Sequence, residues 1–200
     1  MQMKCLYCDE NYIKNSSLIH YLFKKDPLCE KCRSKMIYRP RDINVKDIKV
    51  RAFYEYNPFI SSLILQYKEC HDEALKDIFF YDLIDQIRLK YYGYTIIWVP
   101  STKYNKNKRG FDHMMEMLKC LKMNMLDALY KVNEKSQNNL SKIKREEMMD
   151  NIKLKDNIKV PDKVLLVDDI ITTGSSIYGA YKALKDKCQD IKIIALAYVI

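Results

Sequence analysis

Much of the chain alternates between two patterns of apolar residues. Three runs are almost continuously apolar, as expected for strands buried on both faces of a parallel sheet, and a fourth alternates loosely between apolar and polar residues. The predicted strands cover 47–56, 94–100, 164–169 and 191–199, and a fifth is expected at 125–132. Apolar residues at helical spacing predict helices between them. These cover 57–70, 72–93, 111–123 and 175–186, with a short polar helix expected at 136–151.

Strands that alternate with helices are typical of an α/β fold with a doubly wound, mostly parallel sheet. The 200 residues are enough for one such domain and a small appendage, and 48% hydrophobic with 30% charged residues allows a packed core. No apolar run approaches the roughly 18 residues that span a bilayer. The first residues lack the apolar stretch of a secretory signal peptide. We therefore expect no membrane span and a cytoplasmic location.

Four of the seven cysteines form two closely spaced pairs near the start of the chain. Cys5 pairs with Cys8 and Cys29 with Cys32, each across two residues, and twenty residues separate the pairs. This spacing predicts a Zn²⁺ site, because each pair aims two thiolates at one point. Four thiolates leave no open coordination position, so the metal is expected to be structural. Disulfide bonds are the alternative, and the expected cytoplasmic location argues against them.

The strand predicted at 164–169 ends in two adjacent carboxylates, Asp168 and Asp169, and ligands of parallel sheets bind beyond such strand ends. A turn of small residues then leads into the next predicted helix. It contains Thr172, Thr173, Gly174, Ser175 and Ser176. Amides at a helix N-terminus bind anions, and carboxylates can accept hydrogen bonds from sugar hydroxyls or bind Mg²⁺. The combination predicts a ribose 5-phosphate site, and a plain turn with a capping serine is the alternative.

The segment 164–176 resembles the phosphoribosyl-pyrophosphate (PRPP) fingerprint of type I phosphoribosyltransferases. The order of the four-cysteine module, QYKE, VPSTKYNKNKRGFDH, SQNNLSKIKRE and this fingerprint is similar to the ComF competence family over essentially the full length. The resemblance implies a zinc-ribbon-like module over 1–45 and a phosphoribosyltransferase-like domain over 46–200. It implies that Asp168 and Asp169 hold the ribose and Mg²⁺, that 172–176 hold the 5-phosphate, and that Ser101 and Arg109 contact pyrophosphate.

The chain departs from the family pattern at a few polar positions. Asp112 and His113 stand where the family usually has Asn and Gln, and Met148 stands where Asn is usual. Gln137 and Arg145 match the family. The departures concern the polar network expected around the ligand.

Positive charge is concentrated in one part of the chain. The formal net charge is +9, and residues 100–145 hold eleven Lys and Arg against four Asp and Glu. A basic field attracts phosphate groups. The predicted loop after Pro100 interleaves positive and aromatic side chains, which suits contact with single-stranded nucleic acid. The residues expected to contact DNA are Lys103, Lys106, Lys108 and Arg109.

Two functions stay open at this point. The first, implied by the resemblance, is a DNA-uptake accessory protein of natural transformation that binds single-stranded DNA and retains a PRPP site. Its implied partners are the competence helicase and the DNA-processing protein that loads recombinase. The second is an active phosphoribosyltransferase for a nucleobase or related acceptor, working by positioning and electrostatic stabilisation. Nothing in the sequence identifies a base-recognition pocket.

Overall fold

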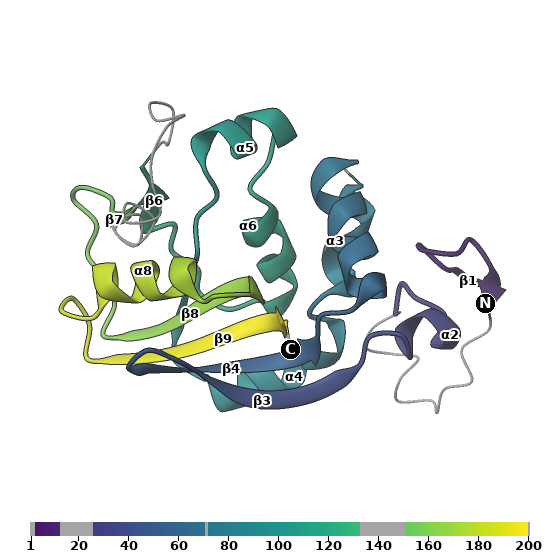
Figure 1. Ribbon diagram of the computed structural model, residues 1–200, viewed down its shortest axis with the longest axis horizontal. Coiled ribbons are helices and arrows are strands. Elements are labelled where there is room, and N and C mark those ends of the chain that lie inside the picture. The colour runs from purple at the N-terminus through teal and green to yellow at the C-terminus, as the bar shows by residue number, and fades with distance from the viewer. Residues whose placement is uncertain (1–2, 13–25, 71, 133–150, 200) are drawn as a thin grey trace.

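A five-stranded sheet forms the centre of the computed structural model, which describes residues 3–12, 26–70, 72–132 and 151–199 (Figure 1). The strand order is β3-β4-β9-β8-β5, and all neighbours except β3 and β4 are parallel. The strands are β3 (Tyr38–Val45), β4 (Ile48–Glu55), β5 (Thr95–Trp98), β8 (Lys163–Ile171) and β9 (Asp190–Tyr198). The prediction of an α/β fold with a mostly parallel sheet is therefore confirmed.

Helices cover both faces of this sheet because its central strands are apolar on both sides. In β8, Val164 and Leu166 pack with α8, whereas Leu165 and Val167 point to the opposite face, where three helices pack. The helices are α8 (Ser175–Leu184) on the first face and α3 (Pro58–Glu69), α4 (Ile84–Lys90) and α6 (His113–Leu118) on the second. This arrangement confirms the doubly wound prediction.

The prediction of one continuous helix over 72–93 is wrong. The chain forms two 3₁₀ segments, η1 (Glu73–Ile78) and η2 (Tyr81–Leu83), before α4 begins. Ile78, Phe79 and Phe80 are all fully buried. Three consecutive side chains cannot share one face of an α-helix, so the chain must turn for all of them to reach the core.

Two other segments also differ from their predictions. Only β6 (Leu129–Lys131) forms within the strand expected at 125–132, and it pairs with β7 (Ile152–Leu154) in a separate antiparallel ribbon. The basic segment expected as a loop is a helix, α5 (Lys103–Arg109). Local capping explains it, because Thr102 accepts a hydrogen bond from the Asn105 amide and Gly110 ends the helix in the left-handed conformation. The predicted helix at 111–123 is shortened to α6 and η3 (Lys119–Leu121).

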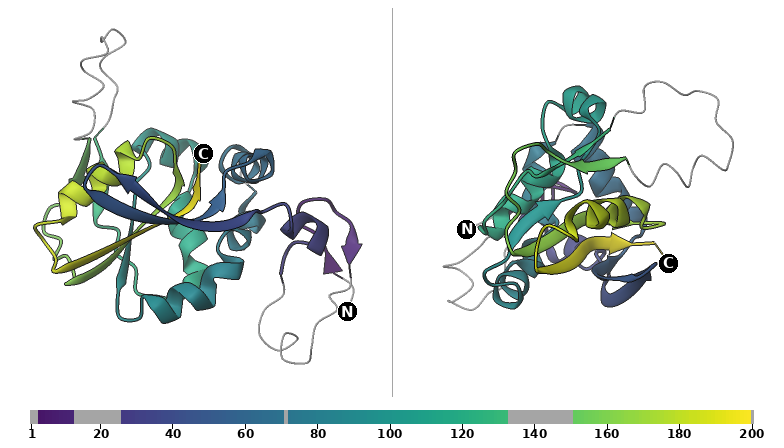
Figure 2. Two further views of the ribbon diagram at one scale, coloured as in Figure 1. Left: turned by 60° about the horizontal axis from the view of Figure 1, so that its bottom comes forward. Right: turned by 90° about the vertical axis from the view of Figure 1, so that its left-hand side faces the viewer.

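The N-terminal cysteines lie in a small unit at one end of the sheet (Figure 2). It contains the hairpin of β1 (Met3–Lys4) and β2 (Asn11–Tyr12), followed by α2 (Glu30–Arg33). The domain boundary predicted between residues 45 and 46 falls in the turn between β3 and β4. β3, on the N-terminal side of that boundary, is hydrogen-bonded to β4 in the main sheet. No helix in the described ranges has the length and apolar content needed to cross a membrane.

Candidate functional site

The predicted strand-turn-helix unit places its polar residues around one pocket. The pocket has a volume of about 250 Å³ and lies at the carboxyl end of β8. Asp168, Asp169 and all five residues 172–176 line it, as do Ser101 and Arg109 from the other side. The structure therefore brings together the residues assigned to ribose, 5-phosphate and pyrophosphate. Of the four residues assigned to DNA, only Arg109 lines this pocket.

The turn into α8 depends on Gly174. Its φ is +75°, a left-handed conformation that side chains with a Cβ adopt with strain. A Cβ at this position would also lie 2.5 Å from Val45 Cγ1 at the end of β3. The Thr173 hydroxyl accepts a hydrogen bond from the Ser175 amide at 3.4 Å. Ser175 and Ser176 at the start of α8 line the pocket. The positive end of the helix dipole lies there and stabilises an anion.

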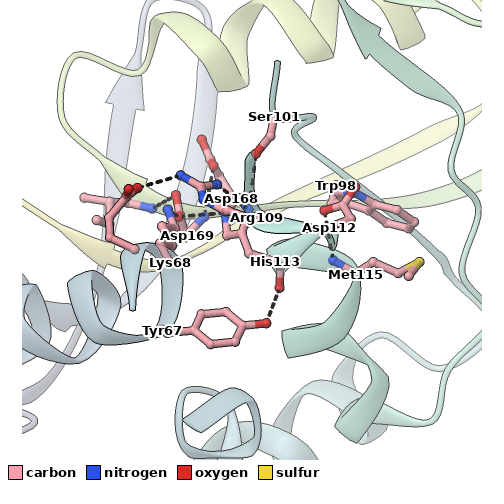
Figure 3. Close-up of polar contacts among 12 residues, drawn as sticks. Tyr67, Lys68, Trp98, Ser101, Arg109, Asp112, His113, Met115, Asp168 and Asp169 are labelled. Carbon is pink, nitrogen blue, oxygen red and sulfur yellow. Dashed lines mark hydrogen bonds and ion pairs between the residues drawn. The ribbon is translucent and has the colours of Figure 1, made fainter. Parts of the chain in front are cut away.

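Asp169 is held by two side chains from other parts of the fold (Figure 3). The Lys68 ammonium, in the last turn of α3, forms an ion pair with Asp169 Oδ2. His113 Nε2 lies 3.2 Å from the same oxygen, and the Ile170 amide donates to Oδ1 at 2.8 Å. Burial acts against the charged carboxylate, but Lys68 and His113 hold the pKa of Asp169 well below its usual range.

His113 connects the carboxylates to the opposite wall of the pocket. Its Nδ1 lies 3.2 Å from the Ser101 hydroxyl and 3.4 Å from the Arg109 guanidinium. Burial lowers the pKa of His113, and the positive charges of Lys68 and Arg109 lower it further. The hydrogen bond with Asp169 acts in the opposite direction but is outweighed. A neutral ring with the proton on Nε2 satisfies every neighbour, because Nε2–H donates to Asp169 and Nδ1 accepts.

Asp168 has a different environment from its neighbour. Only 9% of the residue is exposed, and its Oδ1 accepts a hydrogen bond from the Asp169 amide at 2.9 Å. Burial and the nearby Asp169 charge raise the pKa of Asp168 well above its usual range. Three of the four carboxylate oxygens of the pair are thus already engaged by groups of the protein.

These contacts bear on the expected Mg²⁺. Magnesium uses carboxylate oxygens in a strict octahedral arrangement and keeps several waters. Asp169 Oδ2 is taken by Lys68 and His113, so as arranged it does not fit a directly coordinated divalent ion.

Arg109 is an unusual arginine in the wall of the pocket. Only 10% of its side chain is exposed, and one terminal nitrogen pairs with Glu69 Oε1 at 3.2 Å. Its Nε atom is buried and, within the part of the chain that the structure describes, has no hydrogen-bond partner. A buried N–H without an acceptor is costly. A bound anion would supply the missing acceptor.

Most of the residues expected to bind DNA are engaged within the protein. Lys106 forms an ion pair with Asp112, and Lys108 pairs with Glu69 at 2.9 Å. Asp112 also caps α6 and accepts from Trp98 Nε1 at 3.1 Å. Lys103 is exposed on α5. The predicted basic loop is therefore a helix whose charges are partly neutralised by acidic neighbours.

Several residues of the pocket received no role from the sequence. Lys68 lines the pocket, and the neighbouring Glu69 pairs with Arg109. Both belong to the QYKE segment, to which the sequence assigned no chemistry. Lys131 lines the pocket from β6. The only sequence signal for His113 was that it departs from the family pattern. Gln137, Arg145 and Met148 lie outside the described residues.

The four paired cysteines form the second candidate site. Their sulfur atoms all lie within 4.8 Å of one another, and Cys8 Sγ lies 3.7 Å from Cys29 Sγ. A tetrahedral ion with metal–sulfur distances of about 2.3 Å separates its ligands by about 3.8 Å, so the arrangement fits a four-thiolate site. Burial opposes ionisation of Cys5, yet backbone hydrogen bonds lower its pKa to about 7. A group that could bind a metal ion is therefore present.

The cysteine cluster is tied to the main domain. Arg33 of α2 donates to the Ile78 carbonyl at 3.0 Å, and the Tyr7 ring packs edge-on against Phe59 with centroids 4.7 Å apart. The Tyr7 hydroxyl lies 3.1 Å from Ser62 Oγ on α3. The three buried cysteines belong to the same apolar cluster as the core between the sheet and α3. The metal-binding group is thus continuous with the core of the domain.

Comparison with known proteins adds a structural similarity only. No protein-family model matches the chain, and no curated protein matches its sequence. Among solved structures, a hypoxanthine-guanine phosphoribosyltransferase from Bacillus anthracis is 15% identical over 62% of this chain and 66% of its own, with a TM-score of 0.38. Two crystal forms of a hypoxanthine phosphoribosyltransferase from Staphylococcus aureus are 14% and 18% identical over 62% of both chains, with TM-scores of 0.38. The chain therefore spans less than two thirds of the length of these proteins, and similarity at this level assigns no activity.

Proposed function

We propose that the chain binds PRPP in the pocket at the carboxyl end of β8 and is a phosphoribosyltransferase-like protein. One observation carries the proposal. Two carboxylates and a small-residue turn at the start of α8 share a pocket with the buried Arg109, whose Nε has no acceptor among the described residues. A ligand with sugar hydroxyls, a monophosphate and a diphosphate can satisfy all three features.

Each part of the ligand has a proposed set of contacts. Asp168 and Asp169 hydrogen-bond the ribose hydroxyls, and the amides and hydroxyls of 172–176 hold the 5-phosphate. Arg109 and Lys131 neutralise the diphosphate, with the Ser101 hydroxyl beside them. If transfer occurs, these groups would position the leaving diphosphate and stabilise its developing charge.

Calorimetry tests the proposal directly. Wild-type protein should bind PRPP, and the double change Asp168→Asn with Asp169→Asn should abolish binding because both hydroxyl acceptors are altered. Asp186→Asn, an exposed aspartate beyond α8, is the matched control and should bind as wild type. Wild-type protein that shows no heat with PRPP, with or without Mg²⁺, would refute the proposal. Release of diphosphate with a nucleobase acceptor would extend it to transferase activity.

Single-stranded DNA binding, with the competence helicase and the DNA-processing protein as partners, stays a proposal that rests on the sequence resemblance. In its favour, Lys103 is exposed and the Tyr104 side chain is 60% exposed on the same helix. Ion pairs of Lys106, Lys108 and Arg109 weaken it. Fluorescence anisotropy with oligo-dT at about 0.15 M salt tests it, and the absence of binding at micromolar protein would reject it.

For the cysteine cluster we propose a structural Zn²⁺ ion. The support is the fit of four clustered sulfur atoms to a tetrahedral site without an open position. Zinc would organise the N-terminal unit and would take no part in chemistry at the pocket. Its test is part of the stability predictions below.

A further inference from the structure

Lys68 and Asp169 form a largely buried ion pair inside the candidate pocket. Their side chains are 18% and 13% exposed, and 101 residues of sequence separate them. Both line the pocket. Taking an ammonium and a carboxylate out of water carries a large desolvation cost, which the attraction between them offsets only in good geometry. Stability alone is therefore a weak reason for such a pair at the proposed ribose position.

Lys68 occupies one of the carboxylate oxygens that could bind a divalent cation. Its ammonium contacts Asp169 Oδ2, and His113 Nε2 lies 3.2 Å from that same oxygen. The remaining oxygen of Asp169 accepts from the Ile170 amide. A divalent ion bound directly at Asp169 would have to displace Lys68 or lie against its positive charge. The protein and a metal ion thus compete for one carboxylate.

The pocket also supplies positive charge from its own side chains. Lys68, Arg109 and Lys131 line it together with the two carboxylates. An ammonium has three N–H donors, so Lys68 can donate to Asp169 and still hydrogen-bond a ligand. Arg109 contributes the buried Nε–H that lacks an acceptor among the described residues. These groups can hold a diphosphate without an added ion.

We infer that Lys68 takes the place of the divalent cation in this pocket, so that the ligand binds without Mg²⁺. The inference rests on the proposed PRPP site and specifies how that site works. The ammonium neutralises Asp169 and donates to sugar hydroxyl and diphosphate oxygens of the ligand. Lys68 is thus a ligand-binding residue as well as the partner of Asp169.

Calorimetric titration with PRPP, once in buffer freed of Mg²⁺ by a chelating resin before the protein is added and once in millimolar Mg²⁺, tests the inference. Wild-type protein should bind with affinities that agree within about threefold in the two buffers, because the Lys68 ammonium supplies the positive charge. Lys68→Met removes the charge with little change in length. In the Mg²⁺-free buffer its affinity should fall at least about tenfold, as expected for loss of a charge-assisted hydrogen bond. Mg²⁺ should restore much of that loss, since the ion can then supply the positive charge beside Asp169 that Lys68 no longer provides.

Two further variants sharpen the comparison. Lys68→Arg keeps the positive charge and should retain binding in the Mg²⁺-free buffer. Lys76→Met removes a partly exposed lysine that pairs with Glu116 outside the pocket, and should behave as wild type in both buffers. Thermal unfolding of each variant verifies the fold. The wild-type comparison decides the question even if Lys68→Met does not fold.

The outcomes separate this inference from the proposal on which it depends. Wild-type binding that requires Mg²⁺ overturns the inference and leaves the PRPP site standing. Lys68→Met protein that binds as tightly as wild type in the Mg²⁺-free buffer also overturns it. An absence of PRPP binding in both buffers overturns the inference and the proposed function together.

Discussion

At the scale of single residues, the adjacent Asp168 and Asp169 have opposite electrostatic surroundings. Lys68 and His113 stabilise the charge on Asp169, whereas burial and that same charge disfavour ionisation of Asp168. A pair with separated pKa values avoids the repulsion of two buried charges, because one member carries the charge and the other can hold a proton. The pair can therefore offer a ligand both an acceptor and a donor.

This asymmetry predicts that Asp168→Asn stabilises the protein at neutral pH. A carboxyl with a raised folded-state pKa favours folding below its unfolded pKa, and that contribution is lost as pH rises through the folded pKa. At pH 7 the variant should gain about 1–2 kcal/mol in the free energy of unfolding. At pH 4 the gain should shrink, since the Asp168 carboxyl of the unfolded wild-type chain then also binds a proton. Urea unfolding at both pH values measures it. An equal or lower stability of the variant at pH 7 would contradict the assignment.

His113 leads to a prediction in the opposite direction. Burial lowers its pKa, so between the folded pKa and the usual value near 6.5 the unfolded chain binds more protons. Stability should therefore fall as pH drops below about 6.5. His113→Gln can still donate to Asp169 but does not titrate, so its melting temperature should change less between pH 7 and pH 5. Identical pH profiles for the two proteins would exclude His113 as the source.

At the scale of elements, the start of α8 depends on its contact with the end of β3. Gly174 needs both its positive φ and the absence of a Cβ, because the Val45 methyl groups fill the space beside it. The antiparallel edge strand thus supports the turn that is proposed to hold the 5-phosphate. The two requirements can be separated, since Gly93 has a φ of +79° with nothing near its missing Cβ.

We expect Gly174→Ala to cost about 2–4 kcal/mol, from left-handed strain and steric overlap together. Gly93→Ala should cost only about 1 kcal/mol, from the backbone strain alone. In a Val45→Ala background the Gly174→Ala cost should fall towards that of Gly93→Ala, because the overlap is relieved. Urea unfolding of the four variants measures the coupling. Strict additivity would show that the contact between Val45 and Gly174 does not matter.

At the scale of the whole molecule, the cysteine cluster and the sheet share one apolar core. Cys5, Cys29 and Cys32 are buried in the cluster that also contains Phe59 and Leu63 of α3. Structural zinc supplies folding energy to the segment that it organises. Loss of the ion should therefore lower the stability of the main domain as well as that of the N-terminal unit.

Purified protein is predicted to contain about one zinc per chain. Cys5→Ser with Cys29→Ser, or a strong chelator, should remove the metal and lower the melting temperature by about 5 °C or more. Circular dichroism of the sheet should persist at room temperature, because its strands are held by their own ladder. Cys70→Ser alters an exposed cysteine outside the cluster and should change neither property. Freshly purified protein without zinc by elemental analysis would reject the metal assignment.

The sequence by itself determined the features that depend on local pattern. The apolar runs of β5, β8 and β9, the cysteine spacing and the turn around Gly174 all follow from periodicity or from close neighbours in the chain. A strand buried on both faces needs a continuous apolar run, and a four-thiolate site needs short paired spacing. These patterns can be recognised without knowing which other segments they contact. The α/β fold and the location of the pocket could therefore be predicted.

Only the tertiary structure decided which charges meet. The pairing of Lys68 with Asp169 joins α3 to β8, and Arg109 reaches Glu69 from α5. No spacing rule connects residues so far apart in the chain, and a lysine at the end of a helix normally indicates only a solvated cation near the helix dipole. The packing of α3 beside the carboxyl end of β8 brings that cation into the pocket. Its chemistry is therefore a property of the fold and cannot be found in any one segment.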